Sequence, residues 1–309
     1  MADIVGNETL RDLWQSVVER KGRRHFLTFQ NRVGDVFEYT YAAFDEDANR
    51  IANVFLDLGI EKGDHVALHL HSSPEFLMCL FGLAKIGAVA VPINEQYLAD
   101  EAEYILENSD AICVVVEPLF YETYQELLAR GHYFPKGVVV ARAGTESPRS
   151  NIDFSSIYTP LGTVEEGQQG IYDFWMMRCE QSAILRDSCE LASDDPVQII
   201  YTSGTTSRPK GVVLTHANMV FSGLYGDWEV SLRGSDRVKS TFLADMGQLF
   251  ATALQADGVE GIILNPWNRT LMLEKELIRL HEADPPLQGH RHPVRCHDAS
   301  YAASPASRP

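Results

Sequence analysis

Basic residues are scarce in this sequence. Lysine and arginine together number 26 against 43 aspartates and glutamates, so the formal net charge is −17 at pH 7. This excess of negative charge repels the phosphate backbone of nucleic acids and the surface of anionic membranes. No basic cluster in the sequence offsets it. We therefore expect no nucleic-acid partner.

Long apolar runs are also missing. The longest, over residues 76–93, is interrupted by Lys85 and two glycines, so it is too short and too broken to span a bilayer. Residues 1–20 lack the basic start and the continuous apolar stretch of a secretory signal. These features predict a cytoplasmic protein without a membrane span. They do not predict its oligomeric state.

Cysteine pairs of the kind that hold disulfide frameworks or zinc knuckles are absent too. The five cysteines are odd in number, and no two of them are spaced as C-x-x-C. We expect buried or incidental thiols and no metal site. The 309 residues are 45% hydrophobic and 22% charged, which is typical of a globular protein with one large domain or two smaller ones.

The sequence does contain a regular alternation of strand and helix patterns. Strand patterns occupy 36–39, 65–70, 88–92, 111–116 and 137–141, and helix patterns occupy 40–58, 76–86, 99–108 and 121–129. Most of these strands are apolar on both faces, which predicts an α/β fold with a parallel sheet covered by helices on both sides. Residues 143–192 are less regular, with a loop at 167–170. The acidic run Asp45-Glu46-Asp47 is expected to form a solvated helix face.

One loop carries the chemistry. A strand pattern at 197–201 leads directly into it, and a strand pattern resumes at 212–214. The loop reads Thr202-Ser203-Gly204-Thr205-Thr206-Ser207-Arg208-Pro209-Lys210-Gly211. Its hydroxyl groups, the backbone freedom of its glycine and the lysine ammonium offer many hydrogen-bond donors to a polyphosphate. The loop therefore predicts a phosphate-binding site.

Three other interpretations of the loop differ from this one in what they require of the sequence. A Walker A loop needs the pattern G-x-x-x-x-G-K-[ST] at the start of a helix. Here Pro209 stands in place of the second glycine, Gly211 stands in place of the hydroxyl residue, and a strand pattern follows. An unrelated phosphate-loop hydrolase stays open. A Ser/Thr-rich surface turn is a common feature, but ten successive residues in this unusual order argue against it. Two histidines near the strands, His69 and His216, are expected to pack or cap rather than to catalyse.

The loop resembles a known signature. Residues 201–211 look like the signature loop of the adenylate-forming (AMP-binding) superfamily, with Ser207 where glycine is commoner. Upstream, the segments 69–70, 74–76, 81–88 and 91–94 resemble the crotonobetaine/carnitine–CoA ligases in particular. The resemblance runs from the N-terminus to about Asp236.

This resemblance implies the fold of an acyl-CoA synthetase N-terminal domain and a two-step reaction. A small-molecule carboxylate would be activated by ATP and Mg²⁺ as acyl-AMP and then transferred to CoA. The residues implied to engage the β- and γ-phosphates are Thr202, Ser203, Gly204, Thr205, Thr206 and Lys210. No catalytic residue is assigned, because the family's C-terminal lysine has no counterpart in this sequence.

The later part of the sequence departs from the family pattern. Segment 242–247 has Asp245 where the family's acyl pocket has a histidine, and the adenine- and ribose-binding segments have no counterpart. Residues 1–279 are therefore expected to form an incomplete large N-terminal domain without the C-terminal catalytic domain. Impaired ligase activity is expected, with a non-catalytic ATP-binding or interaction fragment as the alternative.

Residues 280–309 are expected to be a non-native tail. They contain four of the ten histidines and five prolines, with almost no apolar periodicity. When the segment from Leu280 is back-translated and read one base later, its degenerate codons permit an amphipathic sequence that resembles the same ligases. This indicates a one-base slip near Arg279 and Leu280, which the nucleotide sequence of the gene would test.

Overall fold

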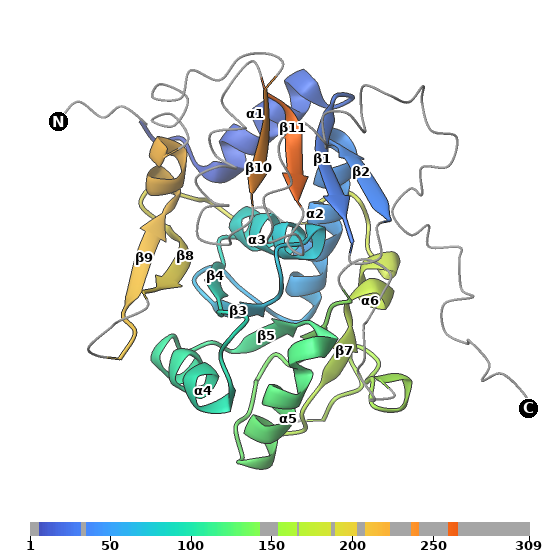
Figure 1. Cartoon of the computed structure of the whole chain (residues 1–309), viewed down its shortest axis with the longest axis vertical. Coiled ribbons are helices and arrows are strands. Elements are labelled where there is room, and N and C mark those ends of the chain that lie inside the picture. The colour runs from blue at the N-terminus through green and yellow to red at the C-terminus, as the bar shows by residue number, and fades with distance from the viewer. Residues whose placement is uncertain are drawn as a thin grey trace, which may run out of the picture.

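The computed structural model describes residues 6–31, 35–142, 154–165, 167–186, 189–202 and 208–222, together with the backbone of two strands at 236–240 and 259–264 (Figure 1). Three predictions fall outside these residues: the centre of the phosphate loop at 203–207, the segment around Asp245, and the tail at 280–309.

A seven-stranded sheet forms the base of the fold, with strand order β7-β6-β5-β3-β4-β8-β9. Its strands are β3 (His65–His69), β4 (Val89–Pro92), β5 (Cys113–Val116), β6 (Val138–Val140), β7 (Ile171–Asp173), β8 (Pro196–Tyr201) and β9 (Gly211–Thr215). All neighbouring strands are parallel except β8 and β9, which form an antiparallel pair. The predicted α/β fold with a parallel sheet is confirmed.

The strands of this sheet are buried on both faces. Along β3, Val66 and Leu68 belong to one hydrophobic cluster and Ala67 belongs to the other. Neighbouring side chains alternate in this way because a β-strand repeats every two residues. The first cluster includes α2 (Tyr41–Asp57) and α3 (Pro74–Ile86), and the second includes α4 (Ala99–Asn108) and α5 (Tyr121–Ala129). Helices thus cover both faces, as predicted.

A second sheet has four strands in the order β10-β11-β1-β2. They are β1 (His25–Gln30), β2 (Val36–Thr40), β10 (Asp236–Ser240) and β11 (Val259–Leu264). The helices α2 and α3 lie between this sheet and the seven-stranded one, and α1 (Leu10–Lys21) lies beside the second sheet (Figure 1). Within the described residues, no helix combines the length and apolarity needed to cross a bilayer.

The two central helices approach each other closely. A Cβ atom on Gly82 of α3 would lie 3.1 Å from the amide nitrogen of Ala52 and 3.2 Å from the carbonyl oxygen of Ala48, both in α2. Only glycine therefore allows this backbone contact without a shift of the helices. The start of α3 is set by Ser73, whose hydroxyl accepts from the Phe76 amide at 3.2 Å, and by Pro74 in the first turn.

The predicted solvated face at 45–47 is wrong for two of its three residues. Asp45 is 9% exposed and accepts from the Lys85 ammonium at 2.7 Å, while Asp47 is 2% exposed and pairs with Arg178. Arg178 belongs to α6 (Phe174–Glu180), which packs beside α2. The two aspartates are buried because α2 is covered on more than one side by other helices.

Candidate phosphate-binding site

The predicted phosphate loop begins at one edge of the seven-stranded sheet. Because β8 runs parallel to β4, with Gln198 opposite Ala90, Tyr201 and Thr202 emerge at the edge where the carboxyl ends of β3, β4 and β5 also lie. In open α/β sheets, ligands bind outside this carboxyl edge. The position of the loop is therefore suited to a ligand site.

The two ends of the loop, residues 201–202 and 209–211, lie side by side, and we call them the neck. Tyr201 pairs with Gly211 in the antiparallel register of β8 and β9, and the Thr202 amide donates to the Lys210 carbonyl at 3.0 Å. The Thr202 hydroxyl lies 3.4 Å from the same carbonyl oxygen. Two of the six predicted phosphate-binding residues, Thr202 and Lys210, are thus side by side. The other four, at 203–206, lie outside the described residues.

The neck presents positive charge to solvent. Lys210 is exposed, and no salt bridge among the described residues involves its ammonium. Gly211 follows it, and a Cβ atom there would lie 2.9 Å from Ile199 Cγ2 and 3.1 Å from Tyr201 Cζ. Any larger residue would therefore require the Ile199 and Tyr201 side chains to shift. The lysine side chain is available to an anionic ligand.

Two histidines follow or end β3 at the same edge. His69 is fully buried, its Nδ1 lies 3.0 Å from the Tyr124 hydroxyl, and its ring stacks on Phe120 at 4.3 Å. Burial, with a smaller contribution from the nearby His71, lowers the pKa of His69 to about 3. The imidazole is therefore neutral, which confirms the prediction of a core histidine.

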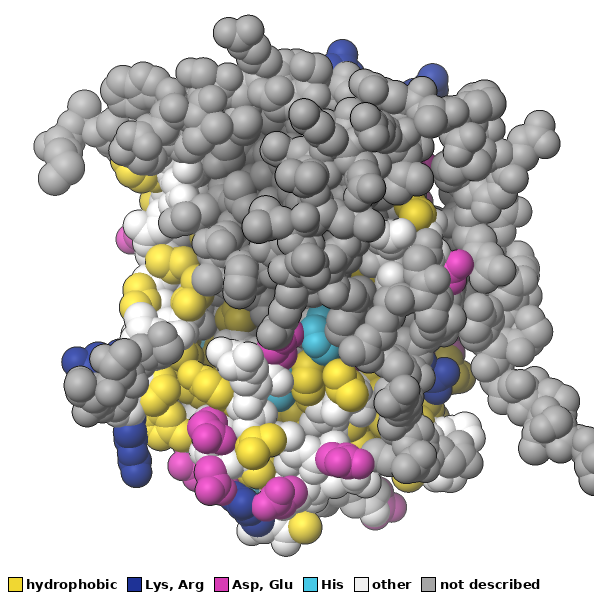
Figure 2. Space-filling model, viewed as in Figure 1, with side chains coloured by type: hydrophobic (Ala, Val, Ile, Leu, Met, Phe, Trp, Pro, Cys, Tyr) yellow, Lys and Arg dark blue, Asp and Glu magenta, His cyan; other side chains and the backbone are white. Residues whose placement is uncertain are grey.

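His71 was not anticipated from the sequence. Its Nδ1 lies 2.5 Å from Glu117 Oε2, and its Nε2 lies 3.2 Å from Glu95 Oε2. Glu117 directly follows β5 and His71 comes two residues after β3, a placement that could have brought them to attention. On the face shown in Figure 2, histidine and acidic side chains lie next to one another and reach the surface.

The second predicted packing histidine, His216, lies just after β9. Its Nδ1 accepts from the amide of Leu10, the first residue of α1, at 3.2 Å. The side chain is fully buried, and burial lowers its pKa to about 4. A neutral, buried imidazole that satisfies a helix N-terminus has a packing and capping role, as predicted.

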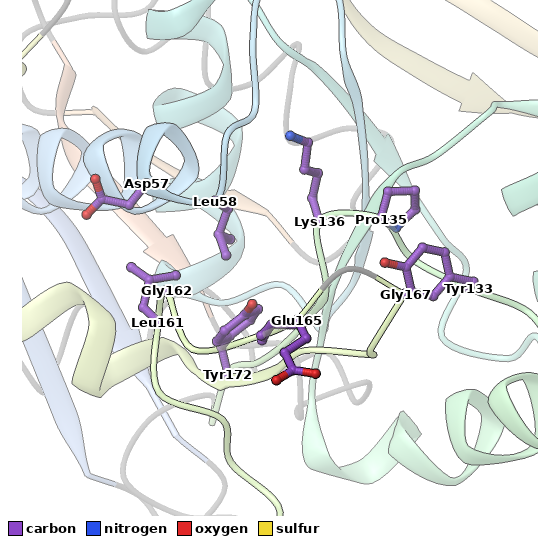
Figure 3. A pocket seen from close by; sticks show the side chains of 11 residues that line it. Asp57, Leu58, Tyr133, Pro135, Lys136, Leu161, Gly162, Glu165, Gly167 and Tyr172 are labelled. Carbon is purple, nitrogen blue, oxygen red and sulfur yellow. The ribbon is translucent and has the colours of Figure 1, made fainter.

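A separate cavity of about 340 Å³ lies away from this loop (Figure 3). Its lining includes Asp57 at the end of α2, Lys136 before β6, and Tyr172 of β7. The Lys136 amide donates to the Ile112 carbonyl just before β5, so this residue is at the amino edge of the sheet. The phosphate loop leaves from the carboxyl edge, so the cavity is not part of the loop site.

The donor set of the neck fits a polyphosphate. It combines an ammonium group with a threonine hydroxyl, both of which donate to phosphate oxygens. Within the described residues, no group of three or more His, Cys, Asp or Glu side chains could hold a metal ion. Mg²⁺ is commonly bound through substrate phosphates and water, so it would reach this site on the nucleotide.

Comparison with known proteins identifies the family. Residues 14–283 match the family described as AMP-binding enzyme. The chain belongs to the AMP-binding enzyme family. This AMP-binding chain is 41% identical over 234 residues to the crotonobetaine/carnitine–CoA ligase of Salmonella paratyphi A, an alignment that covers 76% of the chain and 41% of that relative. The predicted resemblance is confirmed.

Solved structures agree with the family. The N-terminal domain of FACL13 from Mycobacterium tuberculosis superposes with a TM-score of 0.63 at 27% identity, covering 84% of this AMP-binding chain and 57% of that one. A fatty acyl CoA synthetase from the same organism gives a TM-score of 0.62 at 26% identity, with 84% and 45% coverage. The chain therefore has the fold of an acyl-CoA synthetase N-terminal domain and spans about two fifths of its curated ligase relatives' length.

Proposed function

We propose that this chain supplies the ATP phosphate-binding loop of an acyl-CoA ligase. In the first step, a carboxylate oxygen attacks the α-phosphorus of MgATP, and the bond to pyrophosphate breaks. In the second, the CoA thiol sulfur attacks the acyl carbon, the thiol proton is lost, and AMP leaves. The first step is phosphoryl chemistry, in which catalysis consists mainly of positioning and charge stabilisation.

The proposed role of the loop is to hold the leaving pyrophosphate. Thr202, Ser203, Gly204, Thr205, Thr206 and Lys210 would donate to the β- and γ-phosphates. Charge develops on these oxygens as the bond to the α-phosphorus breaks, so donors placed there stabilise the transition state. None of these residues acts as a covalent nucleophile.

One observation carries the proposal: Thr202 and Lys210 are hydrogen-bonded through their backbones at the neck, on the carboxyl edge of the sheet, and the Lys210 side chain is exposed. The acyl substrate is proposed from resemblance alone, as a carnitine-like or other short acyl carboxylate, because the aligned relative is a crotonobetaine/carnitine–CoA ligase. The division into residues 1–279 and a non-native tail at 280–309 stays a proposal.

Lys210→Ala is expected to weaken MgATP binding by about 10- to 100-fold, the range for loss of a hydrogen bond to a charged group. Isothermal titration of the chain with MgATP measures this. Lys136→Ala is the matched control, because it removes a partly buried lysine at the opposite edge of the sheet and should leave the affinity unchanged. Equal affinity of Lys210→Ala and wild type would contradict the phosphate role of the loop.

Carboxylate dependence separates a ligase from the alternative functions. An acyl-CoA ligase exchanges labelled pyrophosphate into ATP only when its carboxylate is present. Carboxylate-independent ATP hydrolysis would instead support a phosphate-loop hydrolase. An affinity for MgATP that is unchanged by Lys210→Ala would support an interaction fragment that lacks turnover.

A further inference from the structure

The helix α4 contacts both ends of the phosphate loop. Tyr104 and Asn108 are four residues apart on α4, so their side chains lie on one face of the helix. The Tyr104 hydroxyl donates to the carbonyl of Pro209, near the end of the loop, at 3.0 Å. Asn108 Oδ1 accepts from the Tyr201 hydroxyl at 2.8 Å, before the loop. A single rigid element thus bridges the entry and the exit of the loop.

Tyr104 holds the two residues that directly precede Lys210. Besides its hydrogen bond to Pro209, its ring lies under the Arg208 guanidinium, with 5.2 Å from Arg208 Cζ to the ring centroid. Such a cation–π contact is attractive even at an exposed site. Proline also restricts its own φ angle and favours an extended residue before it. The backbone that leads into Lys210 is therefore constrained both by its own chemistry and by Tyr104.

The position of α4 is itself fixed by the fold. Its buried residues Ile105 and Leu106 pack in the same hydrophobic cluster as Val91 of β4 and Val114 of β5. On its outer side, Arg130 pairs with Asp100 at 2.8 Å and with Glu103 at 3.0 Å. Tyr104 is consequently presented to the loop from an element that the core holds in place.

We propose that Tyr104 is a positioning residue that presents Lys210 to the phosphates of ATP. The proposal rests on the proposed function of the loop. If the neck is held before the nucleotide arrives, less conformational freedom is lost on binding, and the affinity is higher. Asn108 supports the same arrangement at the start of the loop, through its hydrogen bond with Tyr201.

Limited trypsin digestion tests whether Tyr104 holds the backbone next to Lys210 in place, and it requires no nucleotide. Cleavage at Lys210–Gly211 is compared with cleavage at Arg130–Gly131, a second basic residue followed by glycine, so that global unfolding cancels in the ratio. Tyr104→Phe, which keeps the ring and loses the hydroxyl, should raise this ratio by about 2- to 10-fold, the range for one hydrogen bond. Tyr133→Phe, which removes the hydroxyl of an exposed tyrosine elsewhere, should leave the ratio unchanged.

MgATP titration of the same variants tests the functional consequence. Tyr104→Phe should raise the Kd for MgATP by about 2- to 10-fold, and Asn108→Ala should raise it in the same direction. If the wild-type chain binds no MgATP, both the proposed function and the positioning role of Tyr104 are refuted. If wild type binds and Tyr104→Phe has the wild-type Kd, only the positioning role is overturned, even where the cleavage ratio rises.

Discussion

Asp47→Ala is expected to lower the free energy of unfolding by about 3–5 kcal/mol, the range for removal of one partner from a buried ion pair. Asp47 Oδ1 pairs with Arg178 and accepts from Arg50 at 2.7 Å. The side chains of Asp47 and Arg178 are only 2% and 5% exposed. Without the aspartate, the Arg178 guanidinium stays buried with no other salt-bridge partner among the described residues, and its desolvation is uncompensated. Urea unfolding measures the loss.

Two further variants separate this effect from a general loss of charge on α2. Glu46→Ala removes the neighbouring carboxylate, which is 56% exposed and lies 3.5 Å from Arg50, so it should cost at most about 1 kcal/mol. The double variant Asp47→Leu, Arg178→Met replaces both charges by apolar groups and should recover most of the stability lost by Asp47→Ala. A double variant as unstable as Asp47→Ala would show that the charge pair is not the cause.

Acid is expected to destabilise the fold through two buried histidines. The pKa of His216 is lowered to about 4 and that of His69 to about 3, in both cases mainly by burial, from an ordinary value of 6.5. Between pH 6.5 and the lowered pKa of each histidine, the unfolded chain binds more protons than the folded one. The stabilisation is therefore complete above pH 6.5 and is lost as the pH falls towards 4 and 3. Each histidine contributes on the order of 1 kcal/mol per pH unit in this window.

The variant His216→Asn tests this origin of acid sensitivity. Asparagine keeps an oxygen that can accept from the Leu10 amide but does not titrate, so the slope of stability against pH between 7.5 and 5 should become shallower than in wild type. Adding His69→Gln should flatten it further, because the two sites titrate separately. Carboxylates are the same in all the variants, so a wild-type slope in His216→Asn would refute the assignment.

Much of the secondary structure follows from local patterns. The predicted helices at 99–108 and 121–129 coincide with α4 and α5, and the predicted loop at 167–170 contains no helix or strand. The periodicity of these segments is long enough to identify. Missed elements include β7 with three residues and α6 with seven, which are too short to show a period. The start of α1 did leave a signal, the capping box of Thr9 and Asp12.

Of the candidate site, the sequence identified the residue types and the tertiary structure supplied their neighbours. Thr202 and Lys210 were predicted as phosphate donors, and the structure joins them at the neck. His71 and Glu117 are 46 positions apart and were not paired in advance. Their contact requires β3 and β5 to be adjacent in the sheet, and strand order is not encoded in the pattern of any single strand.

The order of residues alone determined the family, the alternation of strands and helices, and the chemistry of the loop at 202–211, because these depend on local periodicity and on a contiguous motif. Only the tertiary structure decided that Asp45 and Asp47 are buried, since that depends on how many elements pack around α2. Likewise, Tyr104 contacts Pro209 across 105 positions because parallel strands place α4 beside the neck. Such contacts arise from the packing of whole elements, which no local pattern specifies.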